Sequence, residues 1–425
     1  MSQVDILLGL QWGDEGKGKV VDVLAPKYDL VARFQGGPNA GHTLEFDGHK
    51  HVLHQIPSGI FRAGILNVIG NGVVLDPITF QKELEGLAGF GIDFNSQLIV
   101  SNKAQLIVPT HRLLDQAYEK SKGNEKIGST LRGIGPTYED KVARVGLRVG
   151  DVLELDFKEK YEKLKGRHKA ILDYYGFDCS GLAALEVDFW EAVEALKGMN
   201  IQNTEYVINR ALDEGKKVLA EGAQGSLLDV DFGSYPFVTS SNTISAGACA
   251  GLGVSPRRIG EVFGIFKAYC TRVGSGPFPT ELFGEDGENL RKKGNEFGAT
   301  TGRPRRCGWL DLVALKYTCM LNGVSQLFMM KADVLADHEK VEIGTAYEID
   351  GEITEEIPLY STSNLKPVFE SFETWESVGT EHFDELPPQL RDYIQHIESQ
   401  MGIPMGLVSI GPNRSETILK SDIFN

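Results

Sequence analysis

The segment Gly13 to Lys19, GDEGKGK, has the composition of a phosphate-binding loop. It follows an apolar run, Ile6-Leu7-Leu8, and glycines in such a loop let backbone N–H groups converge on phosphate oxygens. The usual motif places Ser or Thr after Gly-Lys, where the hydroxyl binds magnesium. Here that residue is Val20, and the loop instead contains Asp14. Asp14 could bind magnesium in place of the hydroxyl, or act as a base on a substrate beside the phosphate.

Three other segments combine glycine with residues that bind anions or move protons. Gln35 to Thr43, QGGPNAGHT, contains His42, which could act as an acid or electrophile, although a histidine that caps or packs explains this segment equally well. Ile127 to Arg144 suits a phosphate or carboxylate on a small molecule, but a solvated loop explains it equally well. Gly298 to Arg306, GATTGRPRR, is locally basic in an acidic chain, so its arginines could bind a substrate with more than one carboxylate, the alternative being a basic surface loop.

The segment Lys331-Ala332-Asp333 follows an apolar run and suggests recognition of a guanine base. The carboxylate of Asp333 can accept hydrogen bonds from both N1–H and the 2-amino group of guanine, a donor pair that adenine lacks. So short a motif is weak by itself. The three histidines of HKHVLH, residues 49–54, could bind zinc, but no cysteine or carboxylate pattern completes a recognisable site. Packed or solvated histidines are the preferred interpretation.

The elements that would position these residues alternate between strands and helices. Apolar patterns predict strands at 29–34, 218–220 and 327–330, and helices that begin near Pro109, Phe157 and Glu205. This alternation predicts an α/β fold with a large central, mostly parallel sheet flanked by helices, in which ligands bind at the carboxyl ends of the strands. No repeat or clear linker divides the chain, so we expect one domain spanning residues 1–425 with inserted helical and loop subdomains.

Composition excludes several classes of function. The 425-residue chain has a net charge of −16 and a pI near 5.1, which argues against nucleic-acid binding because that requires a basic face. Its five cysteines form no CxxC pair, as expected of free thiols in a reducing compartment. No apolar stretch approaches the ~20 residues of a membrane span, and the N-terminus lacks the basic region of a signal peptide. We therefore expect a cytoplasmic protein that binds neither nucleic acid nor membrane.

Taken together, the motifs resemble those of the adenylosuccinate synthetase family. QWGDEGKGK at Gln11 to Lys19 is similar to the family's first signature, and GIGPTYEDKVAR at Gly133 to Arg144 to its second. NAGHT, EGAQG, VTSSNT, TRVGSGPFPTE, GNEFGATTGRPRR and KAD also appear in the expected order. Because the resemblance covers nearly the whole chain and involves several long motifs, it is far more specific than any one glycine loop.

The resemblance implies a fold related to P-loop NTPases, a homodimer, and a ligase that joins IMP to L-aspartate. GTP would be the co-substrate and Mg2+, one per subunit, the cofactor; the products would be adenylosuccinate, GDP and phosphate, in the first committed step of AMP biosynthesis from IMP. The family's chemistry implies that Asp14 takes the N1 proton of IMP, that O6 attacks the γ-phosphate, and that aspartate displaces phosphate from 6-phosphoryl-IMP. By the same resemblance His42 is the acid, Gln224 is a third catalytic residue, and Asp14 and the backbone carbonyl of Gly41 are the metal ligands.

The resemblance also implies a set of contacts for each substrate. GTP would contact Gly13, Asp14, Glu15, Gly16, Lys17, Gly18, Lys19, Gly41, His42, Thr43, Arg305, Lys331, Ala332, Asp333, Ser409, Ile410 and Gly411. IMP would contact Asp14, Glu15, Gly16, Lys17, Asn39, Ala40, Gly41, His42, Thr130, Gln224, Thr239 and Arg303, together with Arg144 from the neighbouring subunit. Aspartate would contact Ala299, Thr300, Thr301, Gly302, Arg303, Pro304 and Arg305.

The chain departs from the family pattern at a few positions, and two other functions would share its glycine loop. Pro38 stands where a more polar residue is expected, and Ser129 and Leu131 interrupt what is usually a Thr-Thr-Gly or Thr-Thr-Lys run. A related ligase would accept a different amine. A GTP-binding regulatory switch would turn over GTP without IMP, but it would have little use for Asp14, His42 or the arginine loop.

Overall fold

The computed structural model describes residues 3–46, 48–123, 126–298, 302–358, 364–376, 379–380 and 382–420. Its centre is a ten-stranded sheet with the order β20-β19-β15-β11-β1-β10-β2-β5-β7-β9, in which all neighbouring strands run parallel except β19 and β20. In chain order these strands are β1 (Val4–Gly9), β2 (Leu30–Arg33), β5 (Leu66–Ile69), β7 (Leu98–Ser101), β9 (Asn200–Gln202), β10 (Val218–Glu221), β11 (Ile259–Lys267), β15 (Gln326–Met330), β19 (Met405–Ser409) and β20 (Thr417–Leu419). The predicted α/β fold with a large, mostly parallel sheet is confirmed.

Strand β1 lies inside the sheet because both of its faces are apolar. On one face of the sheet, Ile6 belongs to the same hydrophobic cluster as Ala32 of β2. On the other face, Leu7 packs with Val20 of helix α1 (Lys17–Leu24). Strands buried on both faces are typical of parallel sheets that carry helices on each side. Val20, which stands where a phosphate-loop motif would have its metal-binding hydroxyl, is therefore a fully buried core residue.

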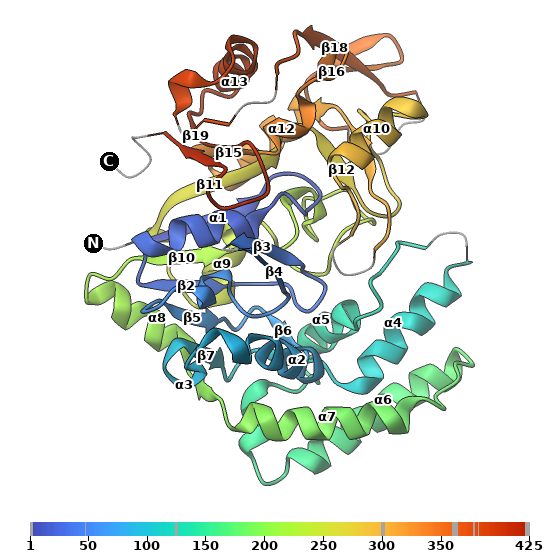
Figure 1. The fold of residues 1–425 in the computed structure, drawn as a ribbon. Coiled ribbons are helices and arrows are strands. Elements are labelled where there is room, and N and C mark those ends of the chain that lie inside the picture. Colours follow the sequence, from blue (N-terminus) through green and yellow to red (C-terminus); the bar gives the residue numbers. More distant parts are fainter. Residues whose placement is uncertain are drawn as a thin grey trace.

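Helices cover the sheet and extend beyond it, as Figure 1 shows. The other α-helices are α2 (Pro77–Leu87), α3 (Phe94–Gln97), α4 (Pro109–Ser121), α5 (Ile134–Ala143), α6 (Phe157–Tyr174), α7 (Leu182–Lys197), α8 (Thr204–Asp213), α9 (Ser245–Leu252), α10 (Glu285–Lys293), α11 (Leu312–Asn322), α12 (Ala332–Leu335) and α13 (Pro388–Met401). Short 3-10 helices occupy Ala25–Lys27, Ser58–Phe61 (η2), Ala88–Phe90, Val149–Leu153, Ser226–Leu228, Pro256–Arg258 and Phe383–Glu385.

The described part of the chain also contains smaller sheets outside the central one. A four-stranded sheet contains β14 (Leu310–Asp311), β16 (Val341–Ile349), β17 (Glu352–Thr354) and β18 (Lys366–Phe372), and three two-stranded pairs consist of β3 (His42–Phe46) with β4 (His49–Leu53), β6 (Val74–Leu75) with β8 (Gln105–Leu106), and β12 (Cys270–Arg272) with β13 (Arg306–Gly308). In Figure 1, β16 and β18 lie at the top and α4, α6 and α7 at the bottom, on opposite sides of the central sheet. We propose that these two parts are the inserted subdomains of a single domain.

The segments predicted from apolar periodicity form the expected elements. The predicted strands are β2, β10 and β15, and the predicted helices are α4, α6 and α8. Helix α6 packs against α4 at the edge of the molecule, as expected from its highly charged sequence. Within the described residues, no helix is both long and apolar enough to cross a bilayer.

Candidate active site

The segments that follow β1, β2, β10, β15 and β19 meet around one cavity of about 1040 Å3. These segments leave the sheet at its carboxyl edge, where parallel sheets bind their ligands. The residues of the predicted site that line the cavity are Gly13, Asp14, Glu15, Gly16, Lys17, Gly18, Lys19, Asn39, Ala40, Gly41, His42, Thr43, Thr130, Gln224, Thr239, Arg305, Lys331, Asp333, Ser409 and Gly411. The fold therefore brings together most of the residues that the sequence predicts to contact a substrate.

Glu15 holds the glycine loop together from the inside. Its buried carboxylate accepts hydrogen bonds from the backbone N–H groups of Gln11 at 3.2 Å and Gly13 at 2.9 Å, and it pairs with Lys17 at 2.5 Å. Lys17 also donates to the backbone carbonyl of Gln224, which ties the loop to the segment after β10. Gly16 precedes α1 with a φ of 99°, a conformation that favours glycine. The carboxylate of Glu15 thus organises the loop.

Lys19 reaches toward the C-terminal strands. Its ammonium group donates to the hydroxyl of Ser409 at 2.8 Å and to the backbone carbonyls of Gly411 at 2.7 Å and Glu416 at 3.0 Å. Burial lowers the pKa of Lys19 to about 8, although nearby carboxylates act in the opposite direction. Both lysines of the loop are therefore held by oxygen atoms of the protein, so they shape the cavity wall as well as adding positive charge to it.

Asp14 faces the cavity and pairs with Arg305. Its side chain is 34% exposed, and its Oδ2 lies 2.9 Å from Nε and 2.8 Å from Nη2 of Arg305. Burial raises the pKa of the Asp14 carboxyl, but Arg305, Lys267 and Lys17 outweigh burial and hold that pKa below its ordinary value. The backbone φ of Asp14 is 57°, and such strained conformations in non-glycine residues cluster at functional sites. Asp14 is therefore an ionised carboxylate that can accept a proton or bind a cation.

His42 begins β3 and is held by Glu221 at the end of β10. Nδ1 of His42 lies 2.5 Å from Oε1 of Glu221, whose two oxygens also accept hydrogen bonds from the hydroxyl of Ser58 at 2.6 Å and its backbone N–H at 2.8 Å. Burial and the nearby guanidinium of Arg33 lower the pKa of His42 to about 4, against the influence of Glu221. Gly18 permits this arrangement, because a Cβ there would lie 2.9 Å from Cβ of His42. The imidazole is thus neutral and fixed in orientation.

Several buried polar atoms at the cavity have no hydrogen-bond partner among the described residues. They are Nε2 of His42, Oδ1 of Asn39, Oδ1 of Asp333, and both amide atoms of Gln224. Buried polar atoms are nearly always paired in folded proteins, so unpaired atoms that line a common cavity indicate a polar ligand. Each of the four residues was predicted from the sequence to contact a substrate.

Asp333 and Lys331 lie at the end of the cavity beside the C-terminal strand β19. Burial raises the pKa of Asp333, and the ammonium groups of Lys331 and Lys19 oppose that shift. Lys331, which directly precedes α12, has a φ of 61° and donates to the backbone carbonyl of Gly294 at 2.6 Å. A carboxylate with an unpaired oxygen beside two cations is suited to a ligand that donates hydrogen bonds and also carries negative charge.

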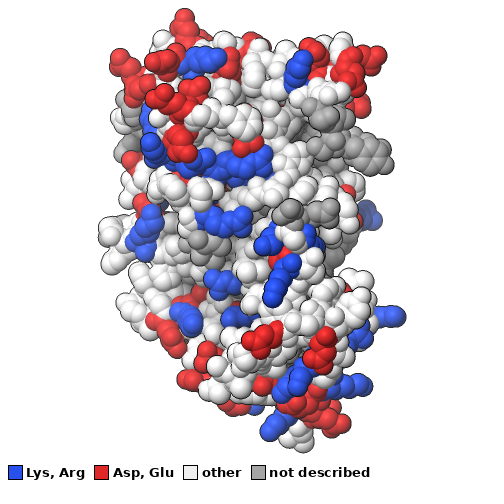
Figure 2. Space-filling view, turned by 90° about the vertical axis from the view of Figure 1, so that its right-hand side faces the viewer, with Lys and Arg blue, Asp and Glu red and all other residues white. Residues whose placement is uncertain are grey.

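The charge distribution agrees with an anionic ligand even though the chain as a whole is acidic. Figure 2 shows Lys and Arg side chains gathered in the middle of one face, whereas Asp and Glu are more frequent toward its two ends. The cavity lining contains both signs of charge: the cations Lys17, Lys19, Lys50, Lys122, Arg272, Lys293, Arg305 and Lys331, and the acidic residues Asp14, Glu15, Glu45, Asp115, Glu119, Glu139 and Asp333. The cations can bind small anions without making the protein a general binder of nucleic acid.

Comparisons with known proteins agree with this geometry. The family model described as Adenylosuccinate synthetase matches residues 6–418. The chain belongs to the adenylosuccinate synthetase family. An adenylosuccinate synthetase from Cytophaga hutchinsonii is 61% identical over 99% of both chains, and one from Flavobacterium psychrophilum is 58% identical over 98% of this chain and 100% of that protein. The solved structure of fully ligated adenylosuccinate synthetase from Plasmodium falciparum is 37% identical, with a TM-score of 0.91 over 99% of this chain and 100% of that chain.

Some residues to which the adenylosuccinate synthetase resemblance gives a substrate contact lie outside the cavity lining. Arg144 is exposed at the C-terminal end of α5, and Nη1 of Arg303 donates to the backbone carbonyl of Gly128 at 3.2 Å. Gly302, Pro304, Ala332 and Ile410 are also absent from the lining in the described part of the chain. The predicted contacts Ala299, Thr300 and Thr301 lie outside the described residues.

The departure at Leu131 has a structural counterpart. Leu131 has a φ of 57° and a side chain that is 42% exposed. That backbone conformation favours glycine, one of the two residues expected here from the family resemblance, and it is strained for leucine. Thr130 nevertheless lines the cavity, so the substitution strains the loop without removing the predicted IMP contact.

Members of the adenylosuccinate synthetase family use Mg2+, and the residues present fit such an ion. Mg2+ prefers oxygen ligands, above all carboxylates. Oδ2 of Asp14 contacts Arg305, whereas its Oδ1 makes no hydrogen bond within the described residues, and the Gly41 segment lines the same cavity. An ionised carboxylate with an uncommitted oxygen matches the chemistry that the ion requires.

The described residues contain one further cluster with the composition of a metal site, but its hydrogen bonds argue against a metal. Nε2 atoms of His111 and His168 each lie 2.8 Å from Oδ2 of Asp140. Nδ1 of His111 accepts the backbone N–H of Val108 at 3.0 Å, so the proton of this ring sits on Nε2 and is donated to Asp140. The hydrogen bonds of this buried cluster link helices α4, α5 and α6. In the HKHVLH segment, His49 and His51 pack against aromatic rings, which confirms the preferred interpretation.

Sequence reasoning missed three buried charged residues of the site. Glu221 is the first residue of the EGAQG motif, and Glu296 lies in the GNEFGATTGRPRR motif, but neither had a predicted role. Lys267, at the end of β11, belongs to no motif and is completely buried. A charged residue at the C-terminal end of a buried apolar strand was the available signal for Glu221 and Lys267, because such residues lie at the carboxyl edge of the sheet.

Proposed function

We propose that this chain joins IMP to L-aspartate with GTP and releases adenylosuccinate, GDP and phosphate. Its membership in a family of ligases of AMP biosynthesis supports the overall reaction. At the site, the proposal is carried by one observation: unpaired buried polar atoms of Gln224, His42 and Asn39 line the same cavity as the ionised carboxylate of Asp14.

Asp14 begins the reaction by taking the proton from N1 of IMP. Loss of this proton places negative charge on O6, which is otherwise a poor nucleophile. O6 then attacks the γ-phosphorus of GTP: the O6–P bond forms, the bond from phosphorus to the bridging oxygen breaks, and GDP leaves with the electron pair. The depressed pKa of Asp14 keeps the carboxylate ionised at neutral pH, so it carries no proton before IMP binds, although the same shift makes it a weaker base.

His42 acts on the phosphoryl group through Nε2, the ring nitrogen without a partner among the described residues. Glu221 holds Nδ1, so the other nitrogen is directed into the cavity. A phosphoryl oxygen that enters there brings negative charge, which favours protonation of Nε2 and lets the ring donate a hydrogen bond to the transferring group. Gln224 can both donate to and accept from the purine, because neither of its amide atoms is otherwise paired.

The amino group of L-aspartate completes the reaction. It attacks C6 of 6-phosphoryl-IMP, the C6–N bond forms, the C6–O bond breaks, and phosphate leaves. Arg305 and Arg303 would bind the two carboxylates of aspartate, since arginine matches carboxylates with paired N–H groups. Arg305 lines the cavity and pairs there with the carboxylate of Asp14, which supports its use as a carboxylate-binding group.

GTP would lie between the glycine loop and the C-terminal strands. Asp333 would accept hydrogen bonds from guanine through its unpaired oxygen, with Lys331 beside the base and Ser409 and Gly411 closing the pocket. Mg2+, held by Asp14 and the carbonyl of Gly41, would supply positive charge to the phosphate groups during transfer.

We also propose a cytoplasmic homodimer in which Arg144 binds the IMP phosphate of the neighbouring site. Arg144 is exposed and does not line the cavity of its own chain, which supports this arrangement. A side chain that binds a ligand in the neighbouring subunit must project from the surface of its own subunit. The neighbouring exposed side chain of Val142, 79% accessible in the single chain, is the kind of apolar group that a partner subunit covers.

Phosphate release from GTP tests the proposal directly. The purified protein is assayed with Mg2+ and GTP, with IMP and L-aspartate each present or omitted, and the purine product is identified by its mass. Release that requires both substrates, with a product that carries aspartate, is the expected result. Release without IMP would indicate an ordinary GTPase and would remove the roles given to Asp14 and His42. Release and product formation that do not depend on L-aspartate would indicate a ligase for a different amine.

A further inference from the structure

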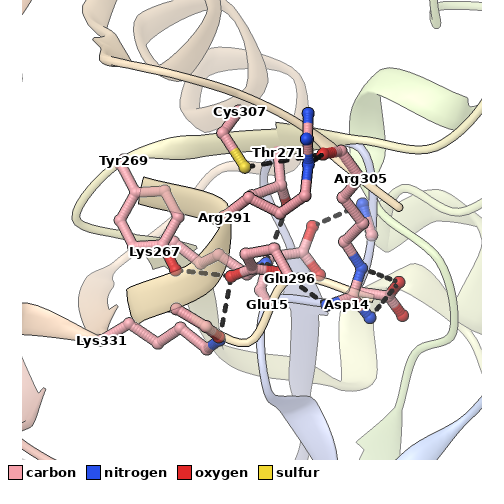
Figure 3. Close-up of polar contacts among 12 residues, drawn as sticks. Asp14, Glu15, Lys267, Tyr269, Thr271, Arg291, Glu296, Arg305, Cys307 and Lys331 are labelled. Atoms are coloured by element: carbon pink, nitrogen blue, oxygen red, sulfur yellow. Dashed lines mark hydrogen bonds and ion pairs between the residues drawn. The ribbon is translucent and has the colours of Figure 1, made fainter. Parts of the chain in front are cut away.

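The carboxylate of Glu296 is the centre of a buried polar network that the reaction described above does not use (Figure 3). Its Oε1 accepts from the hydroxyl of Tyr269 at 2.5 Å and from Nζ of Lys331 at 2.9 Å. Its Oε2 pairs with Nη1 of Arg305 at 2.5 Å, and Nζ of Lys267 lies 2.9 Å from both oxygens. Glu296 and Lys267 are both completely buried. One carboxylate therefore faces three cationic groups.

The network joins both ends of the arginine loop. Glu296 follows α10, and its backbone carbonyl accepts the N–H of Arg305 at 3.0 Å. Nε of Arg291, on α10, donates to the backbone carbonyl of Arg305 at 2.7 Å. Between Glu296 and Arg305 in the chain, Phe297 and Pro304 form an antiparallel β-bridge. The loop that the family resemblance gives to aspartate is thus closed at its base by the backbone contacts of Glu296 and Arg305.

The same carboxylate reaches the opposite part of the cavity through Lys331. The ammonium group of Lys331 is fixed by Glu296 and by the carbonyl of Gly294, two residues apart in the chain. Arg305 uses Nη1 for Glu296, which leaves Nε and Nη2 to contact Asp14. Glu296 therefore determines where Arg305 and Lys331 place the N–H groups that remain for substrates, although it does not line the cavity itself.

We propose that Glu296 is a positioning residue that aligns Arg305 for aspartate and Lys331 for the guanine nucleotide, so that one buried carboxylate serves two substrates. The proposal rests on the proposed function, which gives those two substrates to Arg305 and Lys331. Without this carboxylate, both side chains lose their shared anchor and sample other rotamers, so each substrate is bound less tightly.

A simpler role must be separated from positioning, namely that Glu296 only neutralises the buried charge of Lys267. Burial of an unpaired charge is strongly destabilising, so Glu296→Gln could act through Lys267 alone. The double variant Glu296→Gln with Lys267→Met removes both charges and restores the local balance. If charge balance were the whole role, the double variant would recover both its stability and its wild-type KM values.

The test is steady-state kinetics on Glu296→Gln, Glu296→Asp, the double variant and the wild type. A matched control is Glu281→Gln, because Glu281 pairs with the adjacent Arg306 and does not line the cavity. For Glu296→Gln we expect the KM values for GTP and for L-aspartate each to rise about tenfold or more, the loss typical of removing a buried anchor of a binding group, with a smaller change for IMP. Glu281→Gln should change these constants less than about threefold.

The double variant should unfold at a denaturant concentration closer to that of the wild type while its two KM values remain high. Wild-type KM values in the folded Glu296→Gln protein, or their return in the double variant, would overturn the proposal. If Glu296→Gln does not fold, Glu296→Asp decides the question, because it keeps the charge but cannot reach Lys331 and Arg305 together; wild-type KM values for both substrates would then overturn it. A wild-type protein that forms no adenylosuccinate would instead contradict the proposed function.

Discussion

Nδ1 of His42 lies 2.5 Å from Oε1 of Glu221, although the two residues are 179 positions apart in the chain. Glu221 is the last residue of β10, and its other oxygen accepts the backbone N–H of Ser58 in η2 at 2.8 Å. The carboxylate is therefore fixed by the central sheet and by η2, and it fixes the imidazole in turn. A histidine whose Nδ1 is held by a carboxylate presents a defined Nε2 to its substrate.

Glu221→Gln should lower kcat by about 100-fold with little change in the KM for IMP. The neutral amide no longer stabilises the protonated imidazole through Nδ1–H, so protonation of Nε2 beside the phosphoryl group becomes less favourable, while the amide carbonyl can still accept from Ser58. Steady-state kinetics with saturating GTP and aspartate measure the effect. Ser58→Ala serves as the control that keeps the carboxylate, because it removes only the hydroxyl contacts with Oε1 of Glu221 at 2.6 Å and with Nδ1 of His42 at 3.4 Å. A kcat equal to that of the wild type would show that Glu221 does not orient the acid.

Asp14→Asn should keep the fold but lose nearly all turnover, a fall in kcat of about 100-fold to 10,000-fold. The neutral amide cannot take the N1 proton and binds Mg2+ less well than a carboxylate does. Thermal unfolding checks that the fold is retained, and phosphate release measures the rate. Because Arg305 loses one of its two anionic partners in this variant and keeps only Glu296, a change in the KM for aspartate is also expected. Turnover at the wild-type rate would remove Asp14 from the mechanism.

Mixing two inactive variants tests whether neighbouring subunits share the site. Arg144→Leu and Asp14→Asn proteins should each have low activity, and their mixture should regain part of it, because a hybrid dimer contains one site with both intact residues. Subunit exchange is verified with two differently tagged proteins, and each variant mixed with itself is the control. Proven exchange without recovery of activity would contradict the contribution of Arg144 to the neighbouring site.

Glu83 on α2 should make stability depend on pH in a specific direction. It accepts backbone hydrogen bonds from His54 at 2.6 Å and Gln55 at 3.1 Å, beneath the hairpin that carries His42, and burial raises its pKa to about 7. Because the pKa of Glu83 is higher in the folded protein than its unfolded value of about 4.3, the protonated carboxyl stabilises the fold. This contribution is complete below about pH 4.3 and is lost as the pH rises through about 7.

The advantage of the wild type over Glu83→Gln in the free energy of unfolding should therefore shrink by about 2–3 kcal/mol between pH 5 and pH 9. Urea unfolding at pH 5, 7 and 9 measures this difference. Glu85→Gln, which changes an exposed glutamate on the same helix, reports the general effect of losing one negative charge. An advantage that stays constant or grows with pH would mean that Glu83 does not carry the raised pKa.

The amino-acid sequence by itself determined the local elements, and most of the substrate contacts that it predicted line the cavity. Apolar runs and helical periodicity are local properties, so β2, β10, β15 and the helices after Pro109, Phe157 and Glu205 followed from them. Glycine loops and polar motifs that follow strands were predicted to meet at one edge of a parallel sheet. Asp14, His42, Gln224 and Asp333 do line one cavity there. Their roles in catalysis and binding stay predictions.

Only the tertiary structure decided which charged groups meet. The partners of Lys19 lie near the C-terminus. Apart from Arg305, those of Glu296 come from β11, the segment after it and the segment after β15, so no local pattern could pair them. Tertiary packing also placed Val20 in the core and forced Leu131 to a φ of 57°. The physical reason is the same in each case. A buried charge without a partner is costly, and so is an apolar side chain left in water. The residues that pair with the charge or cover the apolar side chain come from distant segments, which the strand order of the sheet brings together.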